Sequence, residues 1–185
     1  MADPVGASGP PRRAPLHRGR ALIFLTVGSQ VPFDRLSRSV DAWAARHPQT
    51  EVFGQIGRTA WRPAAMRWAE VMEAGEYLDL LKQAKVIVAH AGMGTVISAA
   101  EHGKPLIVMP RRADLGEHRN DHQEFTAKWL MTRPGISVVH DENELHAALD
   151  KADTLVPPDG LNSESCQRMV AVLREFIFDG VRPFQ

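Results

Sequence analysis

The sequence between residues 21 and 151 alternates short apolar runs with amphipathic segments, and this alternation most limits the folds open to the chain. The apolar runs are rich in β-branched residues, which is typical of buried strands. The segments between them place apolar side chains at helical spacing. Parallel neighbouring strands need long crossover connections, which helices supply. The pattern therefore predicts an α/β fold, a doubly wound, Rossmann-like parallel sheet with helices on both faces.

The boundaries of the predicted elements follow from the apolar spacing and from turn residues. The predicted strands cover residues 21–27, 51–56, 86–89, 105–109 and 136–139. The predicted helices cover residues 33–46, 77–84, 92–102, 117–131, 142–151 and 163–178. The first helix illustrates the argument, because Leu36, Val40 and Trp43 recur every three or four residues before a His-Pro pair ends the segment.

The length of 185 residues suits one domain. The first 20 residues are rich in Pro, Gly, Ala and Arg and hold little apolar surface, so we expect residues 1–20 to form a flexible N-terminal arm. Its arginines would allow a local contact with phosphates, but a solvated tail explains the same composition. We expect residues 21–185, including the C-terminal helix at 163–178, to form the single domain.

Charge and cysteine content exclude several classes of protein. Basic and acidic residues number 22 each, so no overall field draws the chain onto nucleic acid, and we expect no nucleic-acid partner. The single cysteine, Cys166, excludes an intrachain disulfide and a multi-thiolate metal site, which is typical of a reducing compartment. No run approaches the roughly 20 apolar residues that span a bilayer, so the expected location is the cytoplasm.

One loop has the composition of a phosphate site. Residues 90–95, His-Ala-Gly-Met-Gly-Thr, join a predicted strand to a predicted helix and carry two glycines, Gly92 and Gly94. Free backbone N–H groups at a helix N-terminus attract phosphate, and glycine permits close approach. The loop lacks the lysine of a P-loop, and Ile97 replaces the third glycine of a dinucleotide fingerprint. A tight strand-to-helix turn without a ligand is the alternative interpretation.

Three stretches in order carry a resemblance to a known family. Residues 86–95, residues 103–110 (Gly-Lys-Pro-Leu-Ile-Val-Met-Pro) and residues 120–123 (Asn-Asp-His-Gln) resemble the C-terminal, nucleotide-sugar-binding half of GT-B glycosyltransferases. The sequence looks most like family 28, and within it like the small split members. These include the PssE-like subunits of bacterial exopolysaccharide synthesis and the cytosolic catalytic subunit of the dolichol-linked N-acetylglucosaminyltransferase.

The resemblance implies a diphosphate site formed by two loops. In this family the His-Ala-Gly loop and the Gly-Ser turn after the first strand face the donor phosphates. The matching positions in this sequence are Gly28, Ser29, His90, Ala91, Gly92, Gly94 and Thr95. A cationic or hydrogen-bond-donating histidine there would stabilise charge on the leaving diphosphate, whereas a histidine that merely ends a strand is the alternative. Gln55 and Arg58, after the next strand, are further candidates.

The resemblance also implies contacts to the sugar and the ribose. The Asn-x-His-Gln segment of the family lies near the donor sugar, which corresponds to Asn120, His122 and Gln123. Side-chain amides suit sugar hydroxyls because they offer donor and acceptor together. Many relatives hold the ribose with a glutamate at the position of Ser98, so either Ser98 or Glu101, one turn further on, is expected to replace it.

The loop before this segment carries four basic side chains: Arg111, Arg112, His118 and Arg119. A guanidinium group pairs with a carboxylate through two parallel hydrogen bonds, so the loop favours a uronic acid as the sugar. Asp114 and Glu117 are internal partners in the alternative interpretation, an ordinary charged surface loop.

No metal or cofactor is expected. His118 and His122 are four residues apart, the spacing of two zinc ligands on a helix, but no nearby Glu or Cys completes such a site. GT-B enzymes generally work without a bound metal, and the UDP-sugar is a donor substrate.

The expected function is that of an inverting, UDP-sugar-dependent glycosyltransferase subunit, the donor-binding half. It is expected to transfer glucuronic acid to a lipid-linked saccharide in exopolysaccharide synthesis. The acceptor site and the catalytic base would belong to a membrane-anchored partner, which recruits the chain to the inner face of the membrane, and His90 would stabilise the leaving group. The alternatives are transfer of N-acetylglucosamine or a neutral hexose, a non-catalytic nucleotide-binding module, and an NAD-dependent enzyme.

The predicted C-terminal helix offers a broad apolar face as the contact with this partner. Its members are Met169, Val170, Val172, Leu173, Phe176 and Ile177. Packing of the same face on the domain's own sheet is the alternative.

Overall fold

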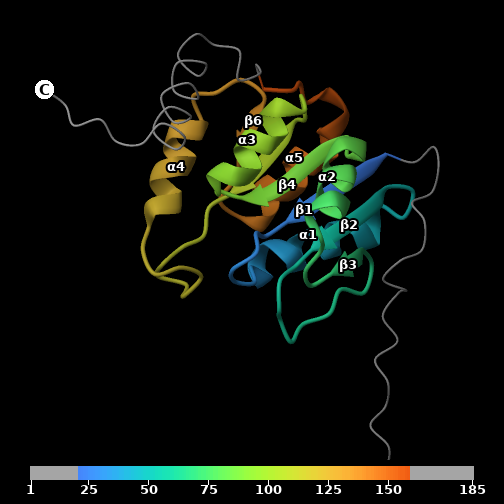
Figure 1. Cartoon of the computed structure of the whole chain (residues 1–185), viewed down its shortest axis with the longest axis horizontal. Coiled ribbons are helices and arrows are strands. Elements are labelled where there is room, and N and C mark those ends of the chain that lie inside the picture. Colours follow the sequence, from blue (N-terminus) through green and yellow to red (C-terminus); the bar gives the residue numbers. More distant parts are fainter. Residues whose placement is uncertain (1–20, 159–185) are drawn as a thin grey trace, which may run out of the picture.

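The computed structural model describes residues 21–158 and contains one six-stranded parallel sheet with the order β3-β2-β1-β4-β5-β6 (Figure 1). The strands are β1 Leu22–Thr26, β2 Glu51–Gln55, β3 Arg67–Ala69, β4 Val86–His90, β5 Leu106–Met109 and β6 Ile136–Val138. The helices are α1 Asp34–Arg46, α2 Ala74–Gln83, α3 Met93–Glu101, α4 His122–Leu130 and α5 Glu142–Asp150, with a 3₁₀ turn at Ala152–Thr154. The predicted doubly wound α/β fold is confirmed.

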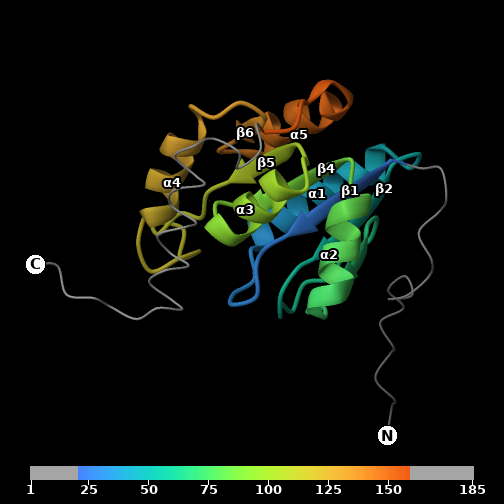
Figure 2. The same cartoon turned by 45° about the horizontal axis from the view of Figure 1, so that its top comes forward.

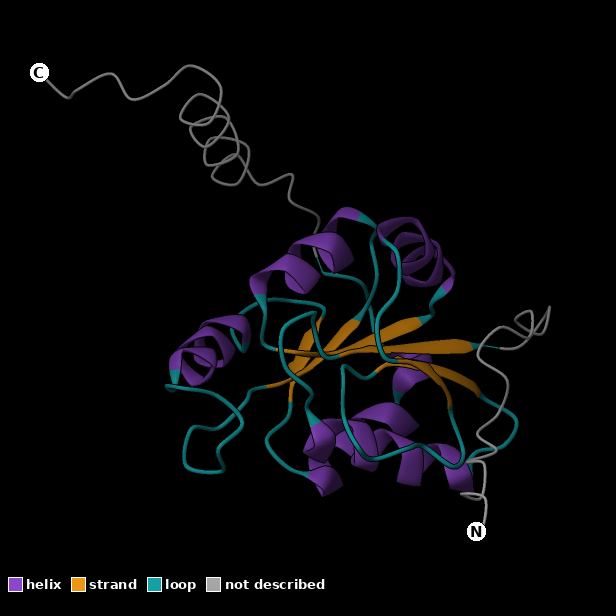
Figure 3. Cartoon of the chain, turned by 60° about the horizontal axis from the view of Figure 1, so that its bottom comes forward, coloured by secondary structure: helices purple, strands orange, loops and turns teal. Residues whose placement is uncertain are grey.

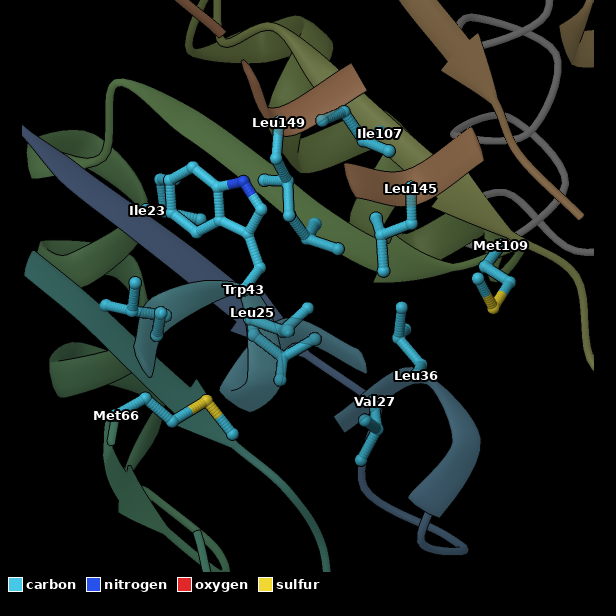
Figure 4. Packing of buried hydrophobic residues seen from close by; sticks show 14 of the residues in the cluster. Ile23, Leu25, Val27, Leu36, Trp43, Met66, Ile107, Met109, Leu145 and Leu149 are labelled. Atoms are coloured by element: carbon cyan, nitrogen blue, oxygen red, sulfur yellow. The ribbon is translucent and has the colours of Figure 1, made fainter. Parts of the chain in front are cut away.

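Helices cover both faces of the sheet (Figure 3). On one face, Leu36 and Trp43 of α1 and Leu149 of α5 pack against side chains of β1 such as Ile23 and Leu25 (Figure 4). On the other face, buried side chains of α2, α3 and α4 pack against the alternate residues of the same strands. Because successive side chains of a strand point to opposite faces, a strand covered on both sides must be apolar throughout. This explains the uninterrupted apolar run of β1.

Strand β3 was missed because a long-range contact creates it. Only Trp68 of its three residues is fully buried, so the sequence carries no apolar run there. The carboxylate of Asp41 in α1 accepts hydrogen bonds of 2.9–3.0 Å from the backbone amides of Ala64, Ala65 and Met66. These bonds guide the chain onto the outer side of β2, where β3 pairs.

Helix α4 begins at His122, five residues later than predicted. The preceding residues form turns, in which the amide of Glu117 donates to the carbonyl of Arg112 at 3.1 Å. The carboxylate of Glu117 is held by Arg35 at 2.7 Å and by the amide of Arg112 at 2.9 Å. These bonds compete with helical hydrogen bonds in the segment, so the prediction that His118 shares a helical face with His122 is wrong.

Some predicted features lie outside the described residues. They are the arm at 1–20, the helix at 163–178 with its apolar face, and Cys166. Within residues 21–158, no helix is long and apolar enough to cross a lipid bilayer.

The strand order creates a crevice at one edge of the sheet. From β1 the chain proceeds outward to β2 and β3, and it then returns to β4, on the other side of β1, and continues to β5 and β6. The loops after β1 and β4 therefore leave the sheet in opposite directions at their shared carboxyl edge. Figure 2 shows the loop after β1, in blue, near the beginning of α3. Ligands of open α/β sheets bind at such a switch point.

Candidate functional site

A pocket of about 740 Å³ opens at the carboxyl ends of β1 and β4, at the switch point of the sheet. The predicted site residues that line it are Gly28, Ser29, His90, Gly92, Gly94, Thr95, Ser98, Arg111, His118, His122 and Gln123. Segments far apart in the sequence thus meet around one cavity.

Two predicted residues, Ala91 and Asn120, do not line this pocket. Ala91 is buried in the apolar core between the sheet and α3. Asn120 contacts His122, whose amide lies 3.4 Å from the Asn120 Oδ1 atom. Glu101 and Arg58 are not among the pocket residues either, whereas Ser98 is. The pocket therefore favours Ser98 over Glu101 for the ribose position.

The ring of His90 lies between two glycines. A Cβ atom at Gly28 would lie 2.8 Å from the Cε1 atom of His90, and one at Gly92 would lie 2.2 Å from its Nε2 atom. Gly28 also has a φ of +81°, a conformation that favours glycine. Both glycines are therefore required by the packing of this ring, which their sequence motif alone does not reveal.

His90 is neutral at physiological pH. Burial lowers the pKa of its imidazole from 6.5 to about 4, and the charges of Arg111 and His118 lower it further, while the nearby backbone of Thr26 acts in the opposite direction. The Nδ1 atom is buried and has no hydrogen-bond partner within the described chain. Of the two forms that the sequence left open, the low pKa disfavours the cationic one in the unliganded protein and leaves the hydrogen-bond donor, since a neutral imidazole donates from one nitrogen.

This low pKa predicts that the protein loses stability in acid through His90. His90 takes up its proton near pH 6.5 in the unfolded chain and only near pH 4 in the folded chain. Its contribution to the free energy of unfolding is therefore fully present above pH 6.5 and is lost as the pH falls from 6.5 to 4. The expected loss is on the order of 3 kcal/mol. Urea unfolding at about pH 7 and about pH 4.5 should show a smaller pH dependence for His90→Asn than for the parent. Equal dependence in the two proteins would contradict the assignment.

Backbone amides provide the polar surface for an anion. The first-turn amides of Met93, Gly94 and Thr95 have no hydrogen-bond partner within residues 21–158, and no side chain caps α3. The amides of Ser29 and Gln30, on the facing loop, have none in the same region. Unpaired N–H groups at a helix start favour a phosphate.

Arg111 has a different environment from the one predicted. Its side chain is 1% exposed, although it reaches the pocket wall. The guanidinium donates to the backbone carbonyls of Val27, Val31 and Pro32 at 2.7–2.9 Å, and more weakly to that of Glu117 at 3.4 Å. The expectation that Arg111 pairs with a sugar carboxylate is therefore wrong, because this pairing needs two parallel donors that already have partners.

The other charged residues of the loop pair mostly with one another. Exposed Arg112 forms two hydrogen bonds of 2.5–3.0 Å to the carboxylate of Asp114. Glu117 pairs with Arg35 of α1. These pairs match the alternative interpretation of a charged surface loop. Of the two remaining members of the predicted cluster, His118 lines the pocket and Arg119 is not among the pocket residues. The pKa of His118 is lowered by burial and by the adjacent charge of His122, which disfavours its cationic form.

Sequence reasoning missed one wall of the pocket. Val71, Met72, Ala74 and Tyr77, from the segment between β3 and α2, line it. Tyr77 packs edge-on against Phe24, with ring centroids 5.4 Å apart. Burial raises the pKa of its hydroxyl, so it stays protonated. No motif marks this wall, because it depends on the unpredicted strand β3.

The rings of His118 and His122 meet edge to face, with centroids 4.4 Å apart. Within residues 21–158, no group of three or more His, Cys, Asp or Glu side chains has the arrangement of a metal site.

A family model and a curated relative match this chain. The model of the glycosyltransferase family 28 C-terminal domain matches residues 22–154, which is well over half of the chain. An L-demethylnoviosyl transferase of Streptomyces niveus is 33% identical over 91 residues, which are 49% of this chain and 22% of that protein.

Solved structures share the fold. The glycotransferase of kitacinnamycin superposes with a TM-score of 0.60 at 18% identity, over 95% of this chain and 44% of that one. ALG13 superposes with a TM-score of 0.54 at 16% identity, over 81% of this chain and 94% of ALG13. The chain thus spans less than half of the first two relatives and nearly all of ALG13. The match of the family model over residues 22–154 shows that the chain belongs to the glycosyltransferase family 28 C-terminal domain family.

Proposed function

We propose that this chain is the donor-binding part of a UDP-sugar-dependent glycosyltransferase. The observation that carries the proposal is that two sets of backbone amides have no hydrogen-bond partner within residues 21–158. One set is at Ser29-Gln30 and the other at Met93–Thr95, on two sides of one pocket at the switch point. Two such groups suit the two phosphates of a nucleoside diphosphate. Membership of the family supports a glycosyl donor as the ligand.

The nucleoside fits the wall that sequence reasoning missed. Val71, Met72 and Tyr77 give this side of the pocket an apolar surface suited to a planar base. Ser98, on α3, lies in the same pocket and offers a hydroxyl to the ribose. The diphosphate would then lie between Gly28-Ser29 and Gly94-Thr95.

The sugar would lie toward His118, His122 and Gln123. The Oε1 atom of Gln123 accepts a hydrogen bond of 3.1 Å from the amide of Arg111, which fixes the orientation of the side chain. Its amide nitrogen has no partner among the described residues and is available for a hydroxyl. Arg111 and Arg112 already have partners elsewhere, so neither of them offers its guanidinium group to a sugar carboxylate here. Arg119 is then the one arginine of the predicted cluster that still supports glucuronic acid. We propose a hexose-type sugar, with glucuronic acid and N-acetylglucosamine as the two donors to compare.

Chemistry at this site consists of positioning and charge stabilisation. The amides that hold the diphosphate would also stabilise the charge that grows on it as the sugar departs with inversion. Neutral His90 would donate one hydrogen bond to the same group.

Acceptor binding is assigned to a partner subunit. The family match is to a C-terminal domain, and the chain spans less than half of the glycotransferase of kitacinnamycin. ALG13, of which it spans 94%, is a protein of comparable extent. We propose that a membrane-anchored partner presents a lipid-linked saccharide and supplies the catalytic base.

Calorimetric titration tests the proposal. The wild-type protein is expected to bind UDP and at least one UDP-sugar, and to bind NAD at least about tenfold more weakly, because the third glycine of the dinucleotide fingerprint is absent. UDP-glucuronate and UDP-N-acetylglucosamine are measured side by side. Preference for NAD, or no binding of UDP, would contradict the proposal.

A further inference from the structure

The loop after β1, residues 27–32, turns an unusual number of its carbonyl groups toward buried side chains. The guanidinium of Arg111, which follows β5, donates to the carbonyls of Val27, Val31 and Pro32 at 2.9, 2.8 and 2.7 Å. Gln55, from the end of β2, donates to the carbonyl of Gly28 at 2.9 Å. Four carbonyls of one six-residue loop therefore have partners from two other strands.

Both side chains are themselves fixed. The guanidinium of Arg111 lies 4.6 Å from the ring centroid of buried Phe33, and the side chain is 1% exposed. Gln55 is 5% exposed, and its Oε1 atom accepts a hydrogen bond of 2.8 Å from Thr26. A buried polar network of this kind is rigid when its members are satisfied.

Two backbone amides at the tip of this loop remain unpaired. The amides of Ser29 and Gln30 have no hydrogen-bond partner in the described part of the chain, and both residues line the pocket. With four of the six carbonyls held by Arg111 and Gln55, the loop is fixed while these two amides stay available, as in an anion-binding concavity.

Arg111 also supplies charge. It is the one arginine or lysine among the described residues that line the pocket, so its buried cation adds an attractive field without contacting solvent. The same charge lowers the pKa of His90.

We infer that Arg111 and Gln55 are positioning residues, Arg111 with the larger effect. Together they hold the loop at residues 27–32 in the conformation that forms the phosphate-binding surface of the donor pocket. Arg111 therefore does not bind the sugar, and its effect on the ligand passes through the loop. The inference rests on the proposed function, because it assumes a ligand with a diphosphate.

The test compares UDP with uridine, which lacks the phosphates, in four variants. Arg111→Lys keeps the charge and loses the fork of donors, and Arg111→Met loses both. Gln55→Met removes the bond to Gly28. Arg62→Met is the matched control, since Arg62 also donates to a backbone carbonyl, that of Trp61 at 3.1 Å, and pairs with Glu70, but does not line the pocket.

The expected result is a loss of UDP affinity of about tenfold in Arg111→Lys and more in Arg111→Met, with uridine affinity within about twofold of the parent. Gln55→Met should lose about fivefold for UDP, and Arg62→Met should match the parent. Arg111→Met leaves three buried carbonyls unpaired, so if it fails to fold, Arg111→Lys and Gln55→Met decide the question.

Two outcomes separate the inference from the proposed function. If the parent does not bind UDP, the proposed function fails. If the parent binds UDP and folded Arg111→Lys and Gln55→Met bind it equally well, or lose uridine by the same factor, the positioning role is wrong.

Discussion

Replacing Gly94 with Val is expected to abolish UDP binding and to leave the fold intact. A Cβ atom at Gly94 would meet no atom within 4 Å, so the larger side chain has room in the unliganded protein. Gly94 is exposed and lines the pocket, so the added methyl groups would occupy the space that the phosphate needs. The expected loss of affinity is at least about hundredfold, which corresponds to ~2.7 kcal/mol. Calorimetry measures the affinity, and circular dichroism checks the fold.

Gly75→Val is the matched control for this substitution. Gly75 is the second residue of α2, as Gly94 is of α3, and a Cβ atom there would also meet nothing within 4 Å. Gly75 is not among the pocket residues. Its replacement should change the helix propensity in the same direction and by the same small amount as in Gly94→Val, and it should leave UDP affinity unchanged. Equal affinities of the two variants would show that the phosphate does not approach Gly94.

Replacing Gly92 with Ala is expected to destabilise the protein through a clash with His90. The new Cβ atom would lie 2.2 Å from the Nε2 atom and 2.7 Å from the Cε1 atom of the ring. Gly28 lies on the other side of the ring, where an added Cβ atom would stand 2.8 Å from the Cε1 atom, so the ring has little room to move in that direction. Overpacking of a buried site costs about 1–3 kcal/mol, and we expect this range in urea unfolding.

A double-mutant cycle identifies the cause of this loss. In a His90→Ala background the ring is absent, so Gly92→Ala should cost only the difference between glycine and alanine at the N-cap of α3, which is about 1 kcal/mol or less. Gly94→Ala, two residues further on, should be neutral or stabilising by about 0.5–1 kcal/mol, because nothing opposes its side chain in a helix. If the effects of His90→Ala and Gly92→Ala on the free energy of unfolding were additive, the close packing of the His90 ring against Gly92 would be contradicted.

Strands and helices whose own residues carry the apolar pattern were predictable from the sequence. The apolar run of β1 and the spacing of Leu36, Val40 and Trp43 in α1 reflect burial by neighbours that any doubly wound sheet provides. The position of the pocket followed from the same logic, since parallel strands end at one edge. Glycines and polar residues directly after β1 and β4 were therefore found.

Features that depend on long-range contacts were not predictable. Strand β3 depends on the carboxylate of Asp41, and the apolar wall with Tyr77 depends on β3. The role of Arg111 was misassigned because a sequence does not reveal which way a guanidinium turns. Its partners belong to residues 27–32, about 80 positions earlier in the chain.

The most direct test of the central claim is an amide NMR titration of the wild-type protein with UDP. We expect the largest shift changes at Ser29, Gln30, Gly94 and Thr95, the amides on both sides of the pocket, with smaller changes at Tyr77. A second cavity of about 330 Å³, lined by Trp43, Lys85 and Asp150, provides an internal control. Changes that centre on this second cavity, or that spread without a centre, would contradict the account.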